Sequence, residues 1–317
     1  MSNLQELFEK TENSRPQSNG PSGLYKVSAK KLLPGKKSYT ATLRILPNVT
    51  RNLESKPFQE KKIYHYINLQ DYPELKGQYD SPTNFDRYAN CELSTLGRAI
   101  NKAAKAGNVI AKSREDAAPL TIKNYSYVLV VKDEQQPELV GKIMVLEYGK
   151  SLYDIFQKYL NGFSEEVMEQ NEDGEEVEVK REVAACDIYS LTKGKDFNLN
   201  VFWTDENKPA TANYTKSSFS NKVTPAPIVS ETGKITRIEL TSDGKIADQK
   251  AVAEFLLSRE YNIEDYSTAH ELTEKQKENI EKIKKILLHG IATDATSKAA
   301  SVLASDKAEE TEEDFFA

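Results

Sequence analysis

Short stretches in which apolar and polar residues alternate recur along the chain, and they limit its possible folds more than any other feature. In residues 39–45, Tyr39, Ala41, Leu43 and Ile45 alternate with polar residues, so they would share one face of a β-strand. Comparable strand patterns occupy residues 61–69, 122–132, 140–148, 187–191, 197–203 and 234–240. The sequence therefore predicts a core built mainly from β-strands.

Four segments have the apolar spacing of amphipathic helices. They span residues 92–106, 152–160, 248–261 and 272–289. Gly107 and Gly290 stand where glycine commonly ends a helix, because glycine adopts a positive φ without steric conflict. The helices do not alternate regularly with the strands. This favours an α+β fold, with a β-barrel or an open β-sheet, over repeated βαβ units.

The chain divides into an arm, a core and a tail. Residues 1–23 join a short helix-compatible stretch to a linker rich in Ser, Asn, Pro and Gly, which predicts an N-terminal arm. Residues 24–290 form the predicted core. Within it, residues 163–182 hold nine carboxylates and two basic side chains, which favours an exposed loop or hairpin. Residues 291–317 are small, polar and acidic, and they predict a flexible, disordered C-terminal tail.

Charge is distributed unevenly along the sequence. Residues 22–160 hold 22 Lys and Arg against 14 Asp and Glu, a net charge of +8, and twelve of the sixteen tyrosines. The remaining residues have a net charge of −14, so the whole-chain charge of −6 is the sum of two opposite parts. Cations beside aromatic rings suit a nucleic-acid strand, because phosphates attract positive charge and bases stack on flat rings.

Two of the predicted strands each place one lysine and two tyrosines on a single face. These residues are Lys62, Tyr64 and Tyr66 in the first strand, and Lys123, Tyr125 and Tyr127 in the second. Stacking of a base on an aromatic ring contributes about 1–3 kcal/mol and accepts any base. Tyrosine is also common in half-buried strands, so packing within the sheet is the alternative interpretation. The repetition of the pattern in the basic part of the chain favours binding.

The predicted helix at residues 92–106 has a basic side. Arg98, Lys102 and Lys105 follow i, i+4 and i+7 spacing, opposite the apolar stripe of the helix. The simpler interpretation is the solvated face of an amphipathic helix. Contact with phosphates is the alternative, and only the neighbouring basic segments support it.

Several functional classes lack their signatures in this sequence. Two cysteines are too few for a disulfide framework, and no Cys-x-x-Cys pair indicates a zinc finger. The chain has no signal-peptide pattern and no apolar run of the roughly 18–20 residues that cross a bilayer, so a soluble protein of a reducing compartment is expected. The three histidines lie far apart and no Gly-rich phosphate loop occurs. We therefore expect no cofactor and no enzymatic activity.

Several motifs, taken in order, resemble those of a known family. Residues 43–47 read LRILP, and residues 127–133 read YVLVVKD. The second motif continues with Pro-Glu at 137, Gly-Lys at 141 and Tyr-Gly-Lys at 148, before a predicted helix. This order and spacing resemble the single-stranded DNA-binding (helix-destabilising) protein of T-even-like tailed bacteriophages. The similarity is patchy, covers roughly residues 25–225, and is weaker at residues 197–201.

The resemblance implies an oligonucleotide/oligosaccharide-binding (OB) barrel whose cleft binds single-stranded DNA without sequence preference. Proteins of this family act in DNA replication, recombination and repair, in the cytoplasm of the infected bacterial host. Aromatic cleft positions correspond to Tyr125, Tyr148 and Tyr214, and phosphate contacts to Arg44 and Lys216; Lys150 belongs to the matching Gly-Lys motif. The predicted DNA-binding residues are Arg44, Lys62, Tyr64, Tyr66, Arg98, Lys102, Lys123, Tyr125, Tyr127, Tyr148, Lys150, Tyr214 and Lys216.

The chain departs from the family in two places. The family holds zinc with one histidine and three cysteines, whereas only His65 and Cys91 lie in the matching region here. We therefore expect no structural zinc, and we expect His65 to pack in the core. The family's arm is basic and supports cooperative self-association. Residues 1–10 are instead mildly acidic and amphipathic, so self-association along DNA would use apolar contacts of this arm.

The C-terminal tail resembles that of the family in being acidic. Its end combines acidic residues with an aromatic tip: Glu312, Glu313, Asp314, Phe315 and Phe316. We expect this tail to bind replication and recombination proteins and to compete with DNA for the basic surface. Two alternatives remain open. One is a phage structural or assembly protein with a solubilising tail, and the other is an RNA-binding or annealing module.

Overall fold

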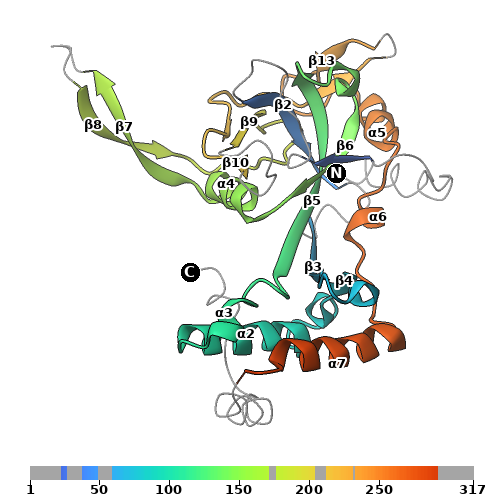
Figure 1. Cartoon of the computed structure of the whole chain (residues 1–317). Coiled ribbons are helices and arrows are strands. Elements are labelled where there is room, and N and C mark those ends of the chain that lie inside the picture. The colour runs from blue at the N-terminus through green and yellow to red at the C-terminus, as the bar shows by residue number, and fades with distance from the viewer. Residues whose placement is uncertain are drawn as a thin grey trace. The chain divides into compact units, whose positions relative to one another are not determined.

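The computed structural model describes residues 23–26, 38–48, 59–170, 176–203, 212–230 and 233–291. Contacts within the chain divide it into two compact units, whose strands and helices are labelled in Figure 1. The first unit comprises residues 1–61 and 123–268, and the second comprises residues 62–122 and 269–317. The predicted core is thus divided between two units. Their elements confirm the predicted α+β fold with a mainly β core.

A mixed β-sheet forms the centre of the first unit. Its strands follow the order β1 (Leu24–Lys26), β6 (Ile143–Tyr148), β5 (Leu120–Asp133), β2 (Tyr39–Leu46), β9 (Phe197–Trp203) and β10 (Ala212–Asn213). β1 pairs with β6 in parallel, and the other neighbours are antiparallel. β11 (Ser218–Phe219) also pairs with β9. The described strand path ends at β1 and β10, so these strands form an open sheet and not a closed barrel.

Both faces of this sheet are buried, because a helix covers each of them (Figure 1). On one face, α4 (Lys150–Asn161) packs Phe156 in the same core as Val128. On the other face, α5 (Gln249–Leu257) packs Leu256 with Tyr127 and Leu129. Successive residues of β5 therefore point into two different cores. Burial on both faces removes apolar surface from water and stabilises the sheet.

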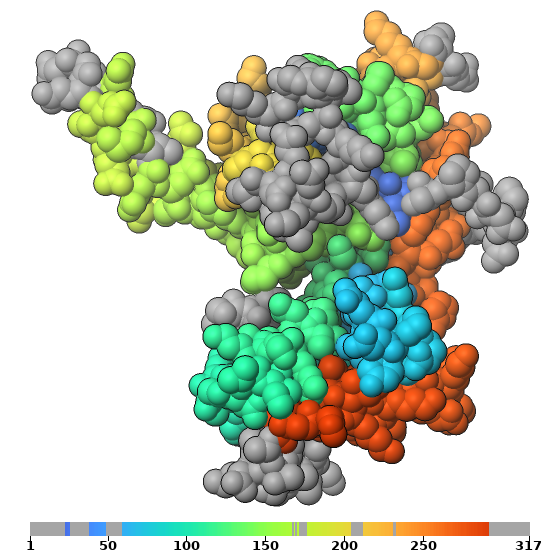
Figure 2. All heavy atoms as spheres, viewed as in Figure 1, coloured from blue at the N-terminus to red at the C-terminus, as the bar shows by residue number. Residues whose placement is uncertain are grey.

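Two hairpins and two short helices are the other described elements of the first unit. β7 (Phe163–Gln170) and β8 (Glu176–Val183) form a separate two-stranded antiparallel sheet, as do β12 (Pro227–Val229) and β13 (Ile235–Arg237). A short 3-10 helix spans Pro137–Leu139, and α6 (Glu264–Ser267) follows α5. Figure 2 shows the β7–β8 hairpin as a yellow-green arm. This hairpin occupies the residues of the predicted acidic excursion.

Two predicted strands differ from the structure. Residues 187–191 form turns, because local side chains bond to the backbone there. The carboxylate of Asp187 accepts a hydrogen bond from the Tyr189 backbone N (3.1 Å), and the Ser190 hydroxyl accepts one from the Lys193 backbone N (3.0 Å). Such bonds compete with a strand ladder. The strand predicted at residues 234–240 is shorter and spans only β13.

The second unit is a small sheet packed with helices. β3 (Glu60–Ile67) pairs with β4 (Gly77–Asp80) and with β5, and two 3-10 helices span Pro73–Leu75 and Pro82–Asn84. Its α-helices are α2 (Glu92–Lys105), α3 (Val109–Lys112) and α7 (Glu274–Leu288). Ile100 of α2 and Ile283 of α7 share one core. Gly107 and Gly290 have φ of 92° and 75°, which confirms the predicted helix ends.

Among the helices of the described segments, none is both long enough and apolar enough to cross a bilayer.

Candidate nucleic-acid interface

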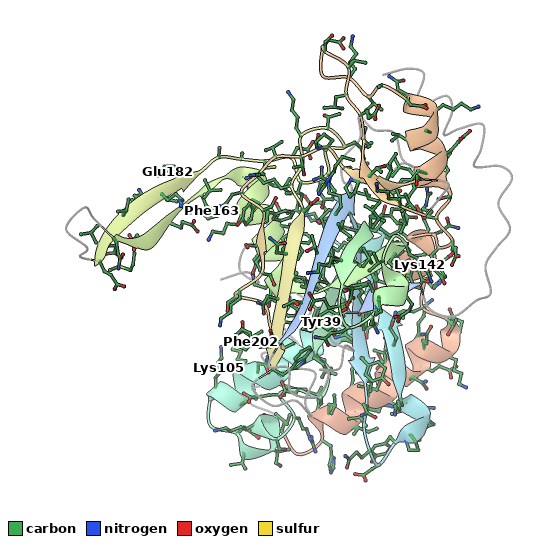
Figure 3. The ribbon with its side chains drawn as sticks, turned by 90° about the horizontal axis from the view of Figure 1, so that it is seen from above. Tyr39, Lys105, Lys142, Phe163, Glu182 and Phe202 are labelled. Atoms are coloured by element: carbon green, nitrogen blue, oxygen red, sulfur yellow. The ribbon has the colours of Figure 1, made fainter. Side chains whose placement is uncertain are left out.

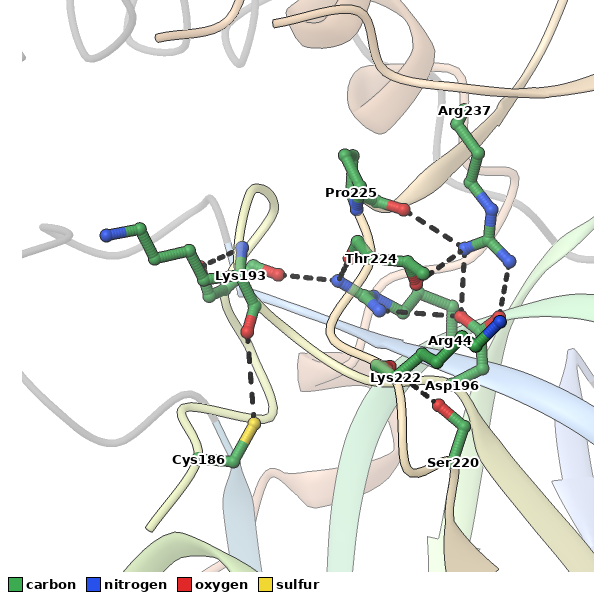
Figure 4. Close-up of polar contacts among 10 residues, drawn as sticks. Arg44, Cys186, Lys193, Asp196, Ser220, Lys222, Thr224, Pro225 and Arg237 are labelled. Carbon is green, nitrogen blue, oxygen red and sulfur yellow. Dashed lines mark hydrogen bonds and ion pairs between the residues drawn. The ribbon is translucent and has the colours of Figure 1, made fainter. Parts of the chain in front are cut away.

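Arg44, predicted to contact phosphate, is enclosed within the first unit (Figure 4). Its guanidinium donates hydrogen bonds to the carbonyl oxygens of Ser190 (2.8 Å) and Thr224 (3.0 Å) and pairs with Asp196 at 3.4 Å. Arg237 of β13 binds both oxygens of the same carboxylate. Burial lowers the pKa of Arg44, whereas the hydrogen bond to Asp196 raises the pKa of Arg237. This burial contradicts the predicted phosphate contact.

Three of the predicted stacking tyrosines are also buried. Tyr125, Tyr127 and Tyr148 expose 4%, 2% and 2% of their surface. The Tyr127 hydroxyl accepts a hydrogen bond from the Ile263 backbone N (2.8 Å), and the Tyr148 hydroxyl donates one to Gln59 (2.9 Å). Burial raises the pKa of Tyr127 and of Tyr148. None of these three rings has a face open to a base, which contradicts the prediction for Tyr125, Tyr127 and Tyr148.

Two predicted lysines form internal ion pairs. The Lys62 ammonium lies 3.3 Å from the Asp80 carboxylate in the second unit, and both side chains are largely buried. The Lys123 ammonium lies 3.3 Å from Glu147 in the first unit, with a quarter of its side chain exposed. A partner carboxylate already neutralises each charge. Both lysines are therefore weaker candidates for phosphate contacts than the sequence indicates.

The remaining seven predicted residues keep exposed or half-buried side chains. Lys150, Tyr214 and Lys216 belong to the first unit, and Tyr64, Tyr66, Arg98 and Lys102 belong to the second. On β3, Ile63, His65 and Ile67 are buried, as predicted for the inner face; of the predicted outer face, Tyr66 is 45% exposed and Tyr64 is half-buried, but Lys62 is buried. The arm and the acidic tail, including residues 312–316, lie outside the described residues.

A cavity of about 480 Å³ in the first unit includes Tyr214 in its wall. α4 contributes Ile155, Lys158 and Tyr159, and β7 contributes Phe163. The rest of the lining is mainly polar and consists of Ser151, Glu165, Ala212, Asn213, Thr215, Ser217 and Ser218. Its volume lies in the range of about 300–1,000 Å³ that is usual for small-molecule sites. The cavity therefore has room for a nucleobase among aromatic and hydrogen-bonding groups.

Two ammonium groups lie close to the aromatic rings of Tyr159 and Phe163, and one of them, that of Lys158, lines the cavity. The rings of Tyr159 and Phe163 lie 5.1 Å apart at an interplanar angle of 74°. The Lys158 ammonium is 3.9 Å from the centre of the Phe163 ring, and that of Lys195 is 6.0 Å from the Tyr159 ring. Burial raises the pKa of Tyr214, so its hydroxyl remains a neutral donor. These cation–π contacts hold positive charge beside flat rings.

Lys216 places a further ammonium group beside an aromatic ring, that of Phe202 on β9. Its ammonium lies 5.5 Å from the centre of the Phe202 ring. Phe202 and Phe163 are both labelled in Figure 3, the first on β9 and the second at the start of the β7–β8 hairpin. Exposed lysines beside rings are suited to follow a phosphate backbone while bases stack.

Sequence reasoning missed Lys158, Tyr159, Phe163 and Lys195 as site residues. It assigned Tyr159 to the apolar stripe of the helix at residues 152–160 and Phe163 to the acidic excursion. One local signal was Gly162 itself, because a glycine directly after the predicted helix favours a turn there. In the structure Gly162 adopts φ 75°, and an added Cβ would lie 2.9 Å from the Ala185 backbone N. That turn places Phe163 beside Tyr159.

The second unit exposes its own aromatic residues. Tyr66, Tyr72, Phe85 and Tyr88 are exposed at 45%, 39%, 55% and 87%, and all four lie within 23 residues of sequence. The Arg87 guanidinium lies 5.9 Å from the centre of the Tyr88 ring. Single exposed apolar side chains are normal on a soluble protein, but exposed rings are also able to stack on bases. They form a second candidate for stacking.

His65 is buried and makes polar contacts within the second unit. Its Nδ1 donates to the Ala118 carbonyl (3.1 Å), and its Nε2 lies 3.0 Å from the Ser94 hydroxyl and 3.5 Å from the Cys91 sulfur. This confirms that His65 packs in the core. Within the described ranges, no group of three or more His, Cys, Asp and Glu side chains could hold a metal ion.

The Cys91 thiol should make stability depend on pH. Burial alone raises its pKa, but hydrogen bonds with His65, Ser94 and Ser81 outweigh burial and lower it from 9.0 to about 6. Between pH 6 and 9 the unfolded chain binds a proton that the folded protein lacks. The free energy of unfolding should therefore rise with pH, by up to about 1.4 kcal/mol per pH unit, and this gain is lost as pH falls through 6.

Urea unfolding at pH 6, 7 and 8 measures this effect. The difference in unfolding free energy between the natural protein and Cys91→Ser should grow with pH. A difference that stays constant across the three pH values would show that the thiol is not ionised in the folded protein.

Comparison with protein-family models and with curated proteins found no match to this chain.

Proposed function

We propose that this chain binds single-stranded DNA without sequence preference and coats it during phage DNA replication, recombination and repair. The observation that carries the proposal is the cavity of the first unit, where Tyr159, Phe163 and Tyr214 lie with Lys158. Aromatic rings stack on any base, and lysines supply the salt-dependent attraction to phosphates. The resemblance of residues 127–150 to the T-even-like phage proteins supports the same function, in the cytoplasm of an infected bacterium.

The sheet of the first unit would then be an opened variant of the OB barrel. OB barrels are partly open, so a strand path with two ends is compatible with this origin. The register between β2 and β5 shifts between Thr42 and Leu43, and such irregularities are frequent at barrel rims and near active sites. The exposed aromatic residues of the second unit would add stacking positions. The acidic tail would bind replication and recombination proteins.

Fluorescence titration with oligo(dT) tests this function, using Trp203 and the tyrosines as reporters. We expect affinity to fall with salt at a log–log slope of about −0.7 per phosphate contacted. Four contacts would weaken binding about fifty-fold between 50 and 200 mM salt. Duplex DNA should bind much more weakly than the single strand.

Two matched variants sharpen the titration. Lys158→Gln with Lys216→Gln should reduce the salt slope, whereas Lys250→Gln, on the helix that covers the opposite face of the sheet, should not. Equal affinity for oligo(rU) would favour an RNA-binding module. Binding to no nucleic acid would favour a structural or assembly protein and reject the proposal.

A further inference from the structure

One face of the β7–β8 hairpin is acidic and surrounds an exposed methionine. Met168 pairs in register with Glu178, and Gln170 pairs with Glu176. Side chains alternate across a strand, so Glu166 shares their face. All five side chains are exposed, Met168 at 59%. We call these five residues the acidic face; Lys180 lies opposite Glu166 on the same face and pairs with Glu182 at 3.8 Å.

Lys180 lies directly opposite Glu166 in the register, whereas Glu176 and Glu178 lie opposite Gln170 and Met168 and face no cation across the hairpin. Among the described residues, Glu176 and Glu178 form no ion pair. A two-stranded hairpin is marginally stable in water when nothing packs against it. The acidic face, with an exposed methionine between carboxylates, is therefore suited to bind a partner surface that is basic and partly apolar.

A corner of the second unit has the opposite character. α3 follows the end of α2 through a tight turn in which the Asn108 side chain accepts a hydrogen bond from the Ala111 backbone N (2.9 Å). Val109 is 80% exposed and Ile110 is 41% exposed. Lys102, Lys105 and Lys112 are exposed on the same two helices, and Lys105 is labelled in Figure 3. We call these five residues the basic corner.

The basic corner also lacks internal counter-charges. Residues 93–114 contain five basic residues and no acidic residue. Lys102, Lys105 and Lys112 pair with no carboxylate among the residues that the structure describes. Three unpaired ammonium groups thus flank two exposed aliphatic side chains.

We infer that the acidic face of one copy of this chain binds the basic corner of a second copy. The carboxylates of Glu176 and Glu178, which face no cation across the hairpin, are complementary to the ammonium groups of the basic corner, and Met168 is complementary to Val109 and Ile110. Nucleic acid is excluded as the occupant of the acidic face, because its phosphates would meet unpaired carboxylates. The contact joins different surfaces of the two copies, so it can repeat from copy to copy and form a linear array. This inference does not rest on DNA binding.

Exchanging the charges tests the contact in the absence of nucleic acid. We expect Glu176→Lys with Glu178→Lys to weaken self-association, measured by sedimentation, about tenfold or more, because it opposes like charges. Lys105→Glu with Lys112→Glu should do the same. A protein carrying all four substitutions should associate nearly as well as the natural protein. The control is Glu239→Lys with Glu254→Lys, which makes the same change in net charge outside the acidic face. It should leave self-association close to that of the natural protein, and it should not restore self-association to Lys105→Glu with Lys112→Glu.

Cross-linking between copies identifies the surfaces directly. Met168→Cys protein is mixed with Val109→Cys protein and treated with a bismaleimide; the natural Cys91 and Cys186 are buried. The mixed product should exceed the products formed by either variant alone. Equal yields, or weakened association in the four-substitution protein, would overturn the inference. Neither result would affect the oligo(dT) titration, so the two proposals fail separately.

Discussion

Replacing Asp196 by alanine should lower the free energy of unfolding of the first unit by about 3–5 kcal/mol. The substitution leaves the guanidinium of Arg44, which has no exposed surface, without its only ion-pair partner among the described residues. An unpaired buried charge carries most of its desolvation penalty. A typical domain is stable by about 5–15 kcal/mol, so this loss would leave the first unit close to unfolding. Urea titration followed by Trp203, in β9, measures it.

The two arginines of this network provide a matched comparison. Arg237→Ala removes a side chain that is 41% exposed and leaves the Arg44–Asp196 pair in place. It should therefore destabilise the unit by only about 1 kcal/mol. If Asp196→Ala and Arg237→Ala had equal effects, the buried position of Arg44 would not be what makes the carboxylate important.

The pattern of strand β2 could be predicted because it depends on neighbouring residues alone. Tyr39, Ala41, Leu43 and Ile45 alternate in the sequence and share one core in the structure. The helix ends at Gly107 and at Gly290 are also local, since a positive φ follows from the residue type. Periodicity and capping therefore predicted the positions of most strands and helices. The strand predicted at residues 187–191 was wrong because side chains such as Asp187 form turns with the backbone there.

The site could be predicted only in part, because burial depends on residues far away in the chain. The period-two pattern placed Tyr125 and Tyr127 on one face, as the structure has them, but it could not reveal that α5 covers that face. Arg44 is buried by Ser190 and Thr224, which follow it by 146 and 180 residues. Tyr214 and Lys216 remain candidates because the first side chain is half-buried and the second is exposed. Tyr214 lines the cavity, and the Lys216 ammonium lies 5.5 Å from the Phe202 ring of β9, so their motif-based assignment stays a prediction.

Replacing Tyr214 by alanine should weaken binding of oligo(dT) by roughly 5- to 150-fold. One stacked base contributes about 1–3 kcal/mol, and each 1.4 kcal/mol changes affinity tenfold. Tyr214 lines the cavity beside Tyr159 and Phe163 and is only half-buried, so its ring is available to a base. Fluorescence titration at constant salt measures the loss. The salt slope should stay unchanged, because the substitution removes no charge.

Two control variants separate stacking from other effects of this substitution. Tyr214→Phe keeps the ring and should retain most of the affinity. Tyr125→Phe changes a ring that is 4% exposed, so it should leave affinity unchanged, in contrast to what the sequence alone predicts. If Tyr125→Phe weakened binding as much as Tyr214→Ala while both proteins remained folded, the DNA would have to enter by opening the sheet, and the cavity would not be the stacking site.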